Sequence, residues 1–257
     1  MLLQKEQNSI AYVALNRPES RNSFHPELIA EITNAFVSLS KRKDIRAIVL
    51  RGVGKVFCAG ADLNWMKEMA EYGPKENKRD SDRLFAMFQA IWNCPHPVIA
   101  EVHGAAFGGA LGLMACCDYV IAEEKTQMCF SEVKLGIVPA VISHFIMQKC
   151  AQGAILPLMM SGKVFSPQEA RYSGLVHVVV NDLDIETEVE KACALFLAAG
   201  HEAVQETKKL ARKVGSLAVS AAKKETGKII CERRSSDEGR EGIRSFLEKR
   251  SPSWKKN

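Results

Sequence analysis

Short apolar runs rich in β-branched residues alternate with helical segments along most of the chain. The strand-like runs are SIAYVAL (9–15), AIVLRG (47–52), PVIAEVHG (97–104), YVIAEE (119–124), TQMCFSE (126–132) and GLVHVVV (174–180). Helical segments are expected at 26–41, 79–93, 109–116, 143–150 and 167–172. This alternation predicts an α/β core in which helices cover strands that are buried on both faces.

The strand pattern ends near residue 186, and the sequence that follows is helical as far as SFLEKR. We therefore expect a mixed core over residues 1–190 and a helical C-terminal region over 191–257. One internal stretch, MAEYGPKENKRDSD (69–82), is polar and interrupted by Gly73 and Pro74. It predicts a surface loop that can act as a pocket lid.

Composition narrows the class of protein. Hydrophobic residues make up 47% of the chain and charged residues 25%, which is typical of a soluble globular protein. The net charge of +5 includes no basic stripe with interleaved aromatic residues, so nucleic acid is not an expected partner. The basic C-terminal letters SWKKN predict a solvated tail. No apolar run reaches the ~18 residues of a membrane span, so no membrane association is expected.

The eight cysteines form no CxxC pair and show no metal-ligand spacing. They are expected to be reduced and buried, which favours a cytoplasmic protein without a structural metal. The N-terminal MLLQKEQNSIAYVAL lacks the basic segment and long apolar run of an export signal, and none is expected.

Two turns built from small residues carry the strongest functional signal. VFCAGADLNWM (56–66) and HGAAFGGALGL (103–113) each follow a strand-like run, and the second leads into a helix near Gly109. The first amides of a helix have no intrahelical partner and favour a negatively charged oxygen. If the fold brings both turns together, a pair of backbone N–H groups can bind one oxygen as an oxyanion hole.

These turns belong to a series of motifs that resembles the crotonase (enoyl-CoA hydratase/isomerase) superfamily. The series consists of LNRPESRNSF (15–24), FCAGADL, HGAAFGGALGL, CCDYVIA, GKVFSPQEARYSGLVHVVV and EGIRSFLEKRSP, and it covers nearly the whole chain. The resemblance implies a spiral core of repeated ββα units, a C-terminal helical region used for trimerisation, and an acyl-CoA thioester substrate. It implies a homotrimer or a hexamer of two trimers, with no cofactor besides the coenzyme A of the substrate.

The resemblance also assigns a site. The oxyanion hole would use the backbone N–H groups of Ala61 and Gly109. Residues implied to contact the substrate or its coenzyme A are Ala59, Gly60, Asp62, Leu63, Trp65, Gly108 and Gly112. Trp65 would line or cover the acyl pocket, although core packing explains this apolar side chain nearly as well.

Hydratases of this family use two glutamates, and this chain keeps one of them. Glu132 in SEVKLG stands four residues before Gly136, as the second glutamate does, whereas Gly112 occupies the position of the first. A lone carboxylate can act as base and then as acid, or can move a proton between carbons 2 and 4. We expected Gly112 to leave space for a water, a substrate branch or an acid from another segment.

Narrower motifs resemble the bacterial methylglutaconyl-CoA and carboxygeranoyl-CoA hydratase branch. That branch implies a branched enoyl-CoA with a terminal carboxylate, for which Lys67, Ser143 and His144 are candidate partners. The sequence thus predicts an enoyl-CoA hydratase, most specifically of the methylglutaconyl-CoA type. An enoyl-CoA isomerase that uses Glu132 alone and a non-catalytic acyl-CoA binding protein remain the alternatives.

Overall fold

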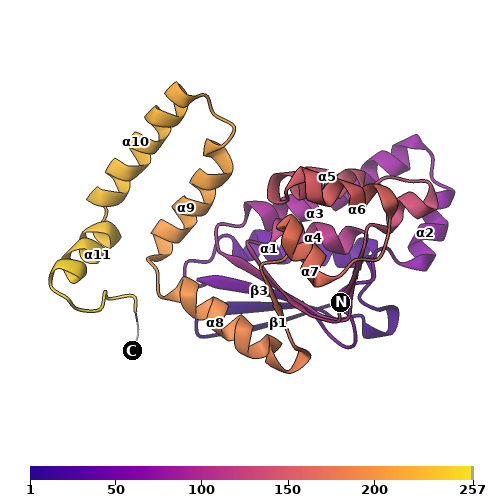
Figure 1. Cartoon of the computed structure of the whole chain (residues 1–257), viewed down its shortest axis with the longest axis horizontal. Coiled ribbons are helices and arrows are strands. Elements are labelled where there is room, and N and C mark those ends of the chain that lie inside the picture. The colour runs from indigo at the N-terminus through magenta and orange to yellow at the C-terminus, as the bar shows by residue number, and fades with distance from the viewer. Residues whose placement is uncertain (256–257) are drawn as a thin grey trace.

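The computed structural model describes residues 1–255 and centres on a six-stranded sheet (Figure 1). The strand order is β1-β2-β3-β4-β6-β8; the β1–β2 pair is antiparallel and the other pairs are parallel. The strands are β1 (Leu2–Gln7), β2 (Ile10–Leu15), β3 (Ala47–Gly52), β4 (Val98–Val102), β6 (Tyr119–Glu123) and β8 (Val178–Val180). A small parallel sheet pairs β5 (Ala105–Phe107) with β7 (Gln127–Cys129). Lys256 and Asn257 of the predicted tail lie outside the described residues.

Helices cover both faces of the large sheet. They are α1 (Pro26–Leu39), α2 (Leu63–Ala70), α3 (Pro74–Asn93), α4 (Gly109–Cys116), α5 (Ala140–Lys149), α6 (Gln152–Ser161), α7 (Pro167–Ser173), α8 (Ile185–Leu197), α9 (His201–Val214), α10 (Val219–Ser235) and α11 (Asp237–Leu247). Three short 3-10 helices complete the fold: η1 (Pro18–Ser20), η2 (Ser131–Leu135) and η3 (Asp182–Asp184).

Side-chain alternation along the strands builds two apolar cores. In β3, Ile48 and Leu50 point into the larger core with α1, α3, α4 and α5, whereas Val49 joins a smaller core under α8. Successive residues of a strand face opposite sides of a sheet, so an uninterrupted apolar strand must be covered on both. The prediction of an α/β core with strands buried on both faces is confirmed.

Three details differ from the sequence-based expectation. The predicted loop at 69–82 is mostly helix, because α3 begins at Pro74, where a missing N–H costs nothing, with Gly73 as its N-cap. The segment 126–132 contributes a strand of three residues only, and Glu132 lies in η2. The mostly exposed strand β1 and the helices α2 and α6 were not predicted at all.

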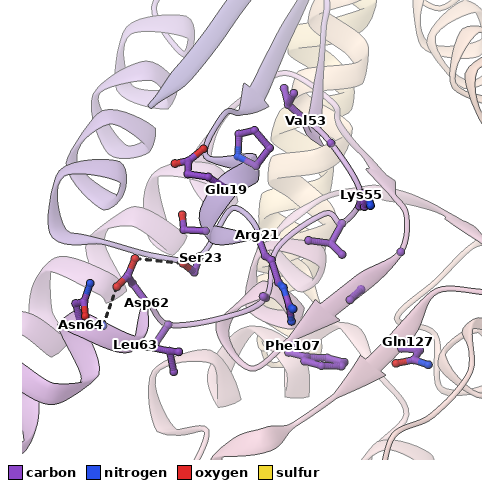
Figure 2. A pocket seen from close by; sticks show the side chains of 18 residues that line it. Glu19, Arg21, Ser23, Val53, Lys55, Asp62, Leu63, Asn64, Phe107 and Gln127 are labelled. Atoms are coloured by element: carbon purple, nitrogen blue, oxygen red, sulfur yellow. Dashed lines mark hydrogen bonds between the residues drawn. The ribbon is translucent and has the colours of Figure 1, made fainter.

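The connections that leave β3 and reach β5 meet beside an open cavity (Figure 2). Val53 and Lys55 follow β3 on one side of this cavity, and Phe107 ends β5 on the other. Ligands bind at the carboxyl ends of parallel strands in open α/β sheets, and this cavity occupies such a place.

Helices α9, α10 and α11, which we call the arm, lie together to one side of the sheet (Figure 1). The predicted boundary at residue 190 falls within α8, which packs against the sheet. The division into two domains therefore stays a prediction.

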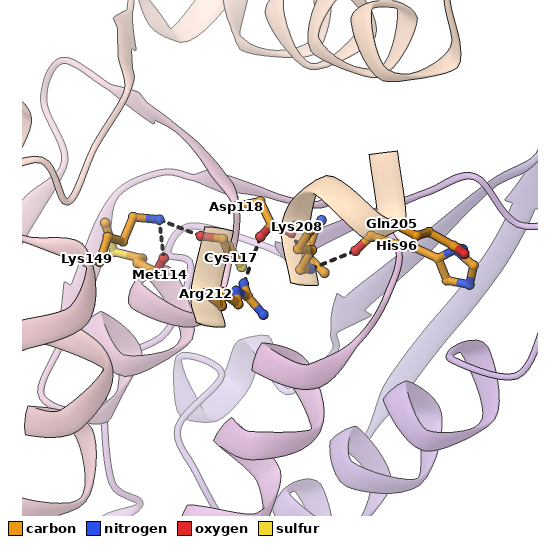
Figure 3. A network of polar contacts seen from close by, with 9 residues as sticks. His96, Met114, Cys117, Asp118, Lys149, Gln205, Lys208 and Arg212 are labelled. Atoms are coloured by element: carbon orange, nitrogen blue, oxygen red, sulfur yellow. Dashed lines mark hydrogen bonds and ion pairs between the residues drawn. The ribbon is translucent and has the colours of Figure 1, made fainter. Parts of the chain in front are cut away.

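A buried ion-pair network connects α9 to the core (Figure 3). The carboxylate of Asp118, which follows α4, accepts hydrogen bonds from the Val98 N–H at 2.8 Å and from Arg212 at 2.8 Å. It also pairs with Lys208, whose ammonium group donates to the His96 carbonyl at 2.8 Å. The Arg212 guanidinium lies 3.9 Å from the centre of the Trp92 ring. One carboxylate thus satisfies two cations that come from the arm.

Two further observations concern the whole described chain. No helix in residues 1–255 is both long enough and apolar enough to cross a membrane. All eight cysteines are free, and seven of them are buried, as the sequence predicted; Cys231 in α10 is exposed, contrary to that prediction.

Replacement of Asp118 by alanine leaves Lys208 and Arg212 without their shared anion. Because the Lys208 and Asp118 side chains are only 10% and 20% exposed, we expect Asp118→Ala to lower the free energy of unfolding by roughly 3 kcal/mol. Urea unfolding measures this loss. In the exposed Lys78–Asp82 pair, Asp82→Ala should cost less than about 1 kcal/mol. Equal losses in both variants would contradict the anchoring role of Asp118.

Candidate active site

The first glycine turn leaves one backbone N–H without an intramolecular acceptor. Phe24 forms a parallel bridge with Ala61, in which the Phe24 N–H donates to the Gly60 carbonyl at 2.7 Å and the Asp62 N–H donates to the Phe24 carbonyl at 2.9 Å. A parallel bridge of this kind uses the groups on either side of Ala61 and turns its own N–H away. Within residues 1–255 the Ala61 N–H donates to no protein acceptor.

The second glycine turn repeats this arrangement at the start of α4. Gly108 has a φ of 54°, which favours glycine, and its N–H donates to the Cys129 carbonyl at 2.9 Å. Gly109 is the first residue of α4, and its N–H has no acceptor in the described chain. A Cβ atom at Gly109 would lie 2.8 Å from the Phe24 ring, so the turn tolerates no side chain there.

Main-chain hydrogen bonds hold the two turns against each other. The Cys58 N–H donates to the Ala105 carbonyl at 3.1 Å, and the Phe107 N–H donates to the Cys58 carbonyl at 3.1 Å. Gly60, with a φ of 92°, lies so close to the second turn that a Cβ atom would stand 3.0 Å from the Phe107 carbonyl oxygen. The fold therefore brings the two predicted turns together. That their free amides share one oxygen remains a prediction.

Glu132 lies beside the second turn. Its Oε1 atom would be 3.3 Å from a Cβ atom at Gly108. Its Oε2 atom is buried and has no hydrogen-bond partner among the described residues. Burial raises the pKa of Glu132, because desolvation disfavours the charged form. A carboxyl group with a raised pKa and a free oxygen is equipped to accept and return a proton.

Gly112 does not border open space, and the expectation that it leaves room for a water or a substrate branch is wrong. A Cβ atom at this position would stand 2.3 Å from Ile142 Cγ2 and 2.8 Å from the Phe88 ring. These side chains come from α5 and α3 and fill the place beside α4. A side chain at position 112 would clash with these two residues. The predicted contact of Gly112 with a substrate stays a prediction.

Trp65 packs into the large core and is only 3% exposed, so core packing describes it better than the predicted substrate contact. Sequence analysis did not single out Asp80 of α3, which lies near this indole. Burial raises the pKa of Asp80, while the Arg83 guanidinium and the Trp65 indole N–H partly oppose that rise.

An open cavity of about 1360 Å³ lies along the first turn (Figure 2). Of the predicted substrate-binding residues, Ala59, Asp62 and Leu63 line it, and Ala61 lines it as well. Gly60 and Gly108 lie behind this wall, where they allow the close approach of the two turns. The cations Arg21 and Lys55 and the amide of Gln127 add polar groups to the lining. Glu19 lines it as well, so the lining carries acids beside the two cations. Its size suits a long ligand, whose anionic groups Arg21 and Lys55 can face.

Asp62 contributes to this wall, but the structure engages both of its oxygens internally. Oδ1 accepts the Asn64 N–H at 2.9 Å and so caps α2, whereas Oδ2 pairs with Arg17 at 2.9 Å. Asp62 thus serves as the N-cap of α2. Arg17 was quoted only as part of a motif, and its ion pair was not foreseen.

Neither Lys67 nor His144, the cations suggested for a substrate carboxylate, lines this cavity, and both are exposed. The Ser143 hydroxyl donates to the Ala140 carbonyl at 2.7 Å within α5. Within residues 1–255 no three His, Cys, Asp or Glu side chains are grouped as metal ligands.

The fold and the paired turns define a crotonase-type α/β protein, and comparison with known sequences agrees. The family model for enoyl-CoA hydratase/isomerase matches residues 5–257, so the chain belongs to the enoyl-CoA hydratase/isomerase family. The 2,3-dehydroadipyl-CoA hydratase of Escherichia coli is 30% identical over 259 residues, which cover 99% of this chain and 98% of the relative.

Solved structures show the same fold over nearly the whole chain. An enoyl-CoA hydratase from Shewanella pealeana superposes with a TM-score of 0.94 at 33% identity and covers 98% of this chain and 95% of its own. Pseudomonas aeruginosa AtuE superposes with a TM-score of 0.95 at 28% identity, with 98% of each chain covered. The predicted crotonase-like α/β fold with C-terminal helices is thereby confirmed.

Replacement of Glu132 by glutamine should stabilise the protein at neutral pH. The folded pKa of Glu132 lies above its ordinary value of 4.5, so the stability that the protonated form provides is complete below that value and is lost as pH rises through the folded pKa. A neutral glutamine avoids this loss. Urea unfolding should show Glu132→Gln to be more stable than wild type at pH 7, and the difference should shrink in acid. The exposed Glu68→Gln serves as control; a less stable Glu132→Gln at pH 7 would contradict the assignment.

Substitution of Gly112 tests the packing of α4. Gly112→Ala forces a methyl group against Ile142 and Phe88, so we expect a loss of about 1–3 kcal/mol. Gly153 in α6 has nothing within 4 Å of an added Cβ, and Gly153→Ala should be neutral or stabilising by up to about 1 kcal/mol. Thermal unfolding of both variants compares them. A stable Gly112→Ala would show that space exists there after all.

Proposed function

We propose that this chain is an enoyl-CoA hydratase, which adds water across the 2,3 double bond of an acyl-CoA thioester. One observation carries the proposal: Glu132, whose Oε2 atom is buried without a hydrogen-bond partner among the described residues, lies with its Oε1 atom next to Gly108. Gly108 belongs to the second turn, which main-chain hydrogen bonds join to the turn that carries the free Ala61 N–H. The family membership and the name of the Escherichia coli relative support the same reaction.

In this proposal each group has one task. The Ala61 and Gly109 N–H groups hold the thioester oxygen, which gains negative charge when water adds to carbon 3. Glu132 accepts the proton of that water as the new C–O bond forms. The electron pair of the double bond moves to an enolate, and Glu132 then returns the proton to carbon 2. Atoms and charge balance without a metal or a redox cofactor, so we propose that none is needed.

A single carboxylate suits this cycle because its pKa is raised. Burial raises the pKa of Glu132 towards neutral pH, where a group can both accept and donate a proton. No second acid fits at position 112, since Phe88 and Ile142 occupy that place. We infer that the base and acid steps both pass through Glu132.

The large cavity would hold the coenzyme A part of the substrate. Arg21 and Lys55 on its wall are suitable partners for the phosphates. For the acyl group we propose a branched enoyl chain with a terminal carboxylate, of the methylglutaconyl type. This rests on the motif resemblance and on the Escherichia coli relative, which is named for a substrate that is also the thioester of a dicarboxylic acid.

We further propose a homotrimer or a hexamer in a reducing compartment such as the cytoplasm. The arm exposes large apolar side chains in the single chain: Phe246 is 82% exposed and Leu247 is 73% exposed. Contiguous apolar side chains of this kind usually mark an interface. The unbonded cysteines support the compartment.

Loss of the enoyl-thioester absorbance tests the reaction directly. Wild type should hydrate 3-methylglutaconyl-CoA faster than crotonyl-CoA, and Glu132→Gln should lower kcat by about 10²–10⁴-fold. Glu68→Gln should behave as wild type. The acid limb of the pH profile should lie above 4.5, the ordinary value, because burial raises the pKa of Glu132.

Three outcomes would contradict this proposal. Conversion of a 3-enoyl-CoA to the conjugated isomer without alcohol formation would identify an isomerase. Tight binding without turnover of any enoyl substrate would identify a binding protein. Full activity in Glu132→Gln would remove the proton-transfer role from this residue.

A further inference from the structure

A shielded ion pair joins the first glycine turn to the start of η1. Arg17 Nη2 lies 2.9 Å from Asp62 Oδ2, and the two side chains are only 14% and 10% exposed. The other arm of the guanidinium, Nη1, donates to the Ser23 carbonyl at 2.7 Å. Arg17 therefore connects the segment before α1 with the residue that directly follows Ala61.

Asp62 transmits this connection to the backbone of the turn. Its Oδ1 atom caps α2 through the Asn64 N–H at 2.9 Å, and the Ser23 hydroxyl lies 3.4 Å from Oδ2 (Figure 2). Its N–H is bound to the Phe24 carbonyl at 2.9 Å. Asp62 is thus fixed by its main chain and by both carboxylate oxygens, which restrains the residue that follows Ala61. The peptide that carries the Ala61 N–H is the preceding one, and its Gly60 carbonyl accepts the Phe24 N–H at 2.7 Å.

The segment that carries Arg17 is itself held rigidly. The Asn22 side chain is fully buried, donates to the Val53 and Val56 carbonyls at 2.9 Å each, and accepts the Arg17 N–H at 2.9 Å. Arg21 and Asn22 adopt φ values of 54° and 55°. Two consecutive non-glycine residues in the left-handed region persist only where their surroundings fix them.

We propose that Arg17 and Asp62 are positioning residues, which hold the free Ala61 N–H in the orientation that polarises the thioester carbonyl. This inference rests on the proposed function. Arg17 also neutralises the Asp62 carboxylate, which otherwise would place an uncompensated negative charge one residue from the developing oxyanion. Neither side chain touches the reacting atoms.

A bound chromophore reports the position of the Ala61 N–H, and this measurement does not require the enzyme to turn over a substrate. The dimethylaminocinnamoyl thioester of coenzyme A absorbs at longer wavelength when its carbonyl oxygen accepts hydrogen bonds. We expect wild type to produce this red shift and Arg17→Met to lose most of it. With an enoyl-CoA substrate, Arg17→Met should lower kcat by about 10–100-fold, as misplacement of a reacting group by about 1 Å does, and KM should change little.

Two milder variants keep the test valid if Arg17→Met does not fold. Arg17→Lys retains the charge but loses the two-armed geometry, and should recover part of the red shift. Asp62→Asn retains an oxygen for the α2 cap but loses the ion pair, and should resemble Arg17→Met. Arg42→Met removes an exposed pair with Glu6 and Asp44, and should leave both the red shift and kcat unchanged.

The outcomes separate the two proposals. A wild-type red shift that Arg17→Met and Asp62→Asn both keep would overturn the positioning role alone. A probe that binds to wild type without any red shift would refute the oxyanion hole of the proposed function, and the positioning role with it. A loss of red shift that only matches a loss of thermal stability, and that Arg17→Lys does not restore, would mark the pair as merely structural.

Discussion

The close contact between two backbone turns is the constraint on which the site depends. The Cys58 N–H donates to the Ala105 carbonyl and the Cys58 carbonyl accepts from the Phe107 N–H, and these bonds join the turn after β3 to the turn before α4. A side chain at Gly60 would press against the Phe107 carbonyl of the second turn, and one at Gly109 would press against the Phe24 ring. Main-chain groups make this contact. The N–H groups of Ala61 and Gly109 take no part in it and have no acceptor in the described chain. The close approach of the two turns therefore accompanies the candidate anion site.

The helical and strand periodicities predict the α/β core well, because local patterns determine which faces are apolar. The two turns and Glu132 were also predictable, since each is recognised within a few neighbouring residues. The helix α3 was predicted from residue 79 onward, but its start at Pro74 was missed because its charged first half shows no apolar stripe, although Pro74 after Gly73 is a normal helix start. Tertiary packing against α1, which short-range patterns do not encode, stabilises this helix.

What the sequence could not provide were contacts between distant segments. Arg17 and Asp62 are 45 residues apart, and nothing in either motif indicates that they pair. Gly112 looked like an open place because glycine has no side chain. Whether that place is empty depends on Phe88 and Ile142, which two other helices supply. A glycine creates a cavity only where the neighbouring side chains do not fill the space beside it.

Glu132 differs from Asp118 and Asp62 because it has no cationic partner in the part of the chain that the structure describes. Asp118 is paired with two cations of the arm, and Asp62 is paired with Arg17. Among the described residues, Glu132 provides the one buried carboxylate oxygen that lacks a hydrogen-bond partner. An unpaired buried carboxylate costs stability, which the chain avoids elsewhere by pairing. An unpaired oxygen of Glu132 beside the second turn is explained if a substrate and a water supply the partners that the protein itself does not provide.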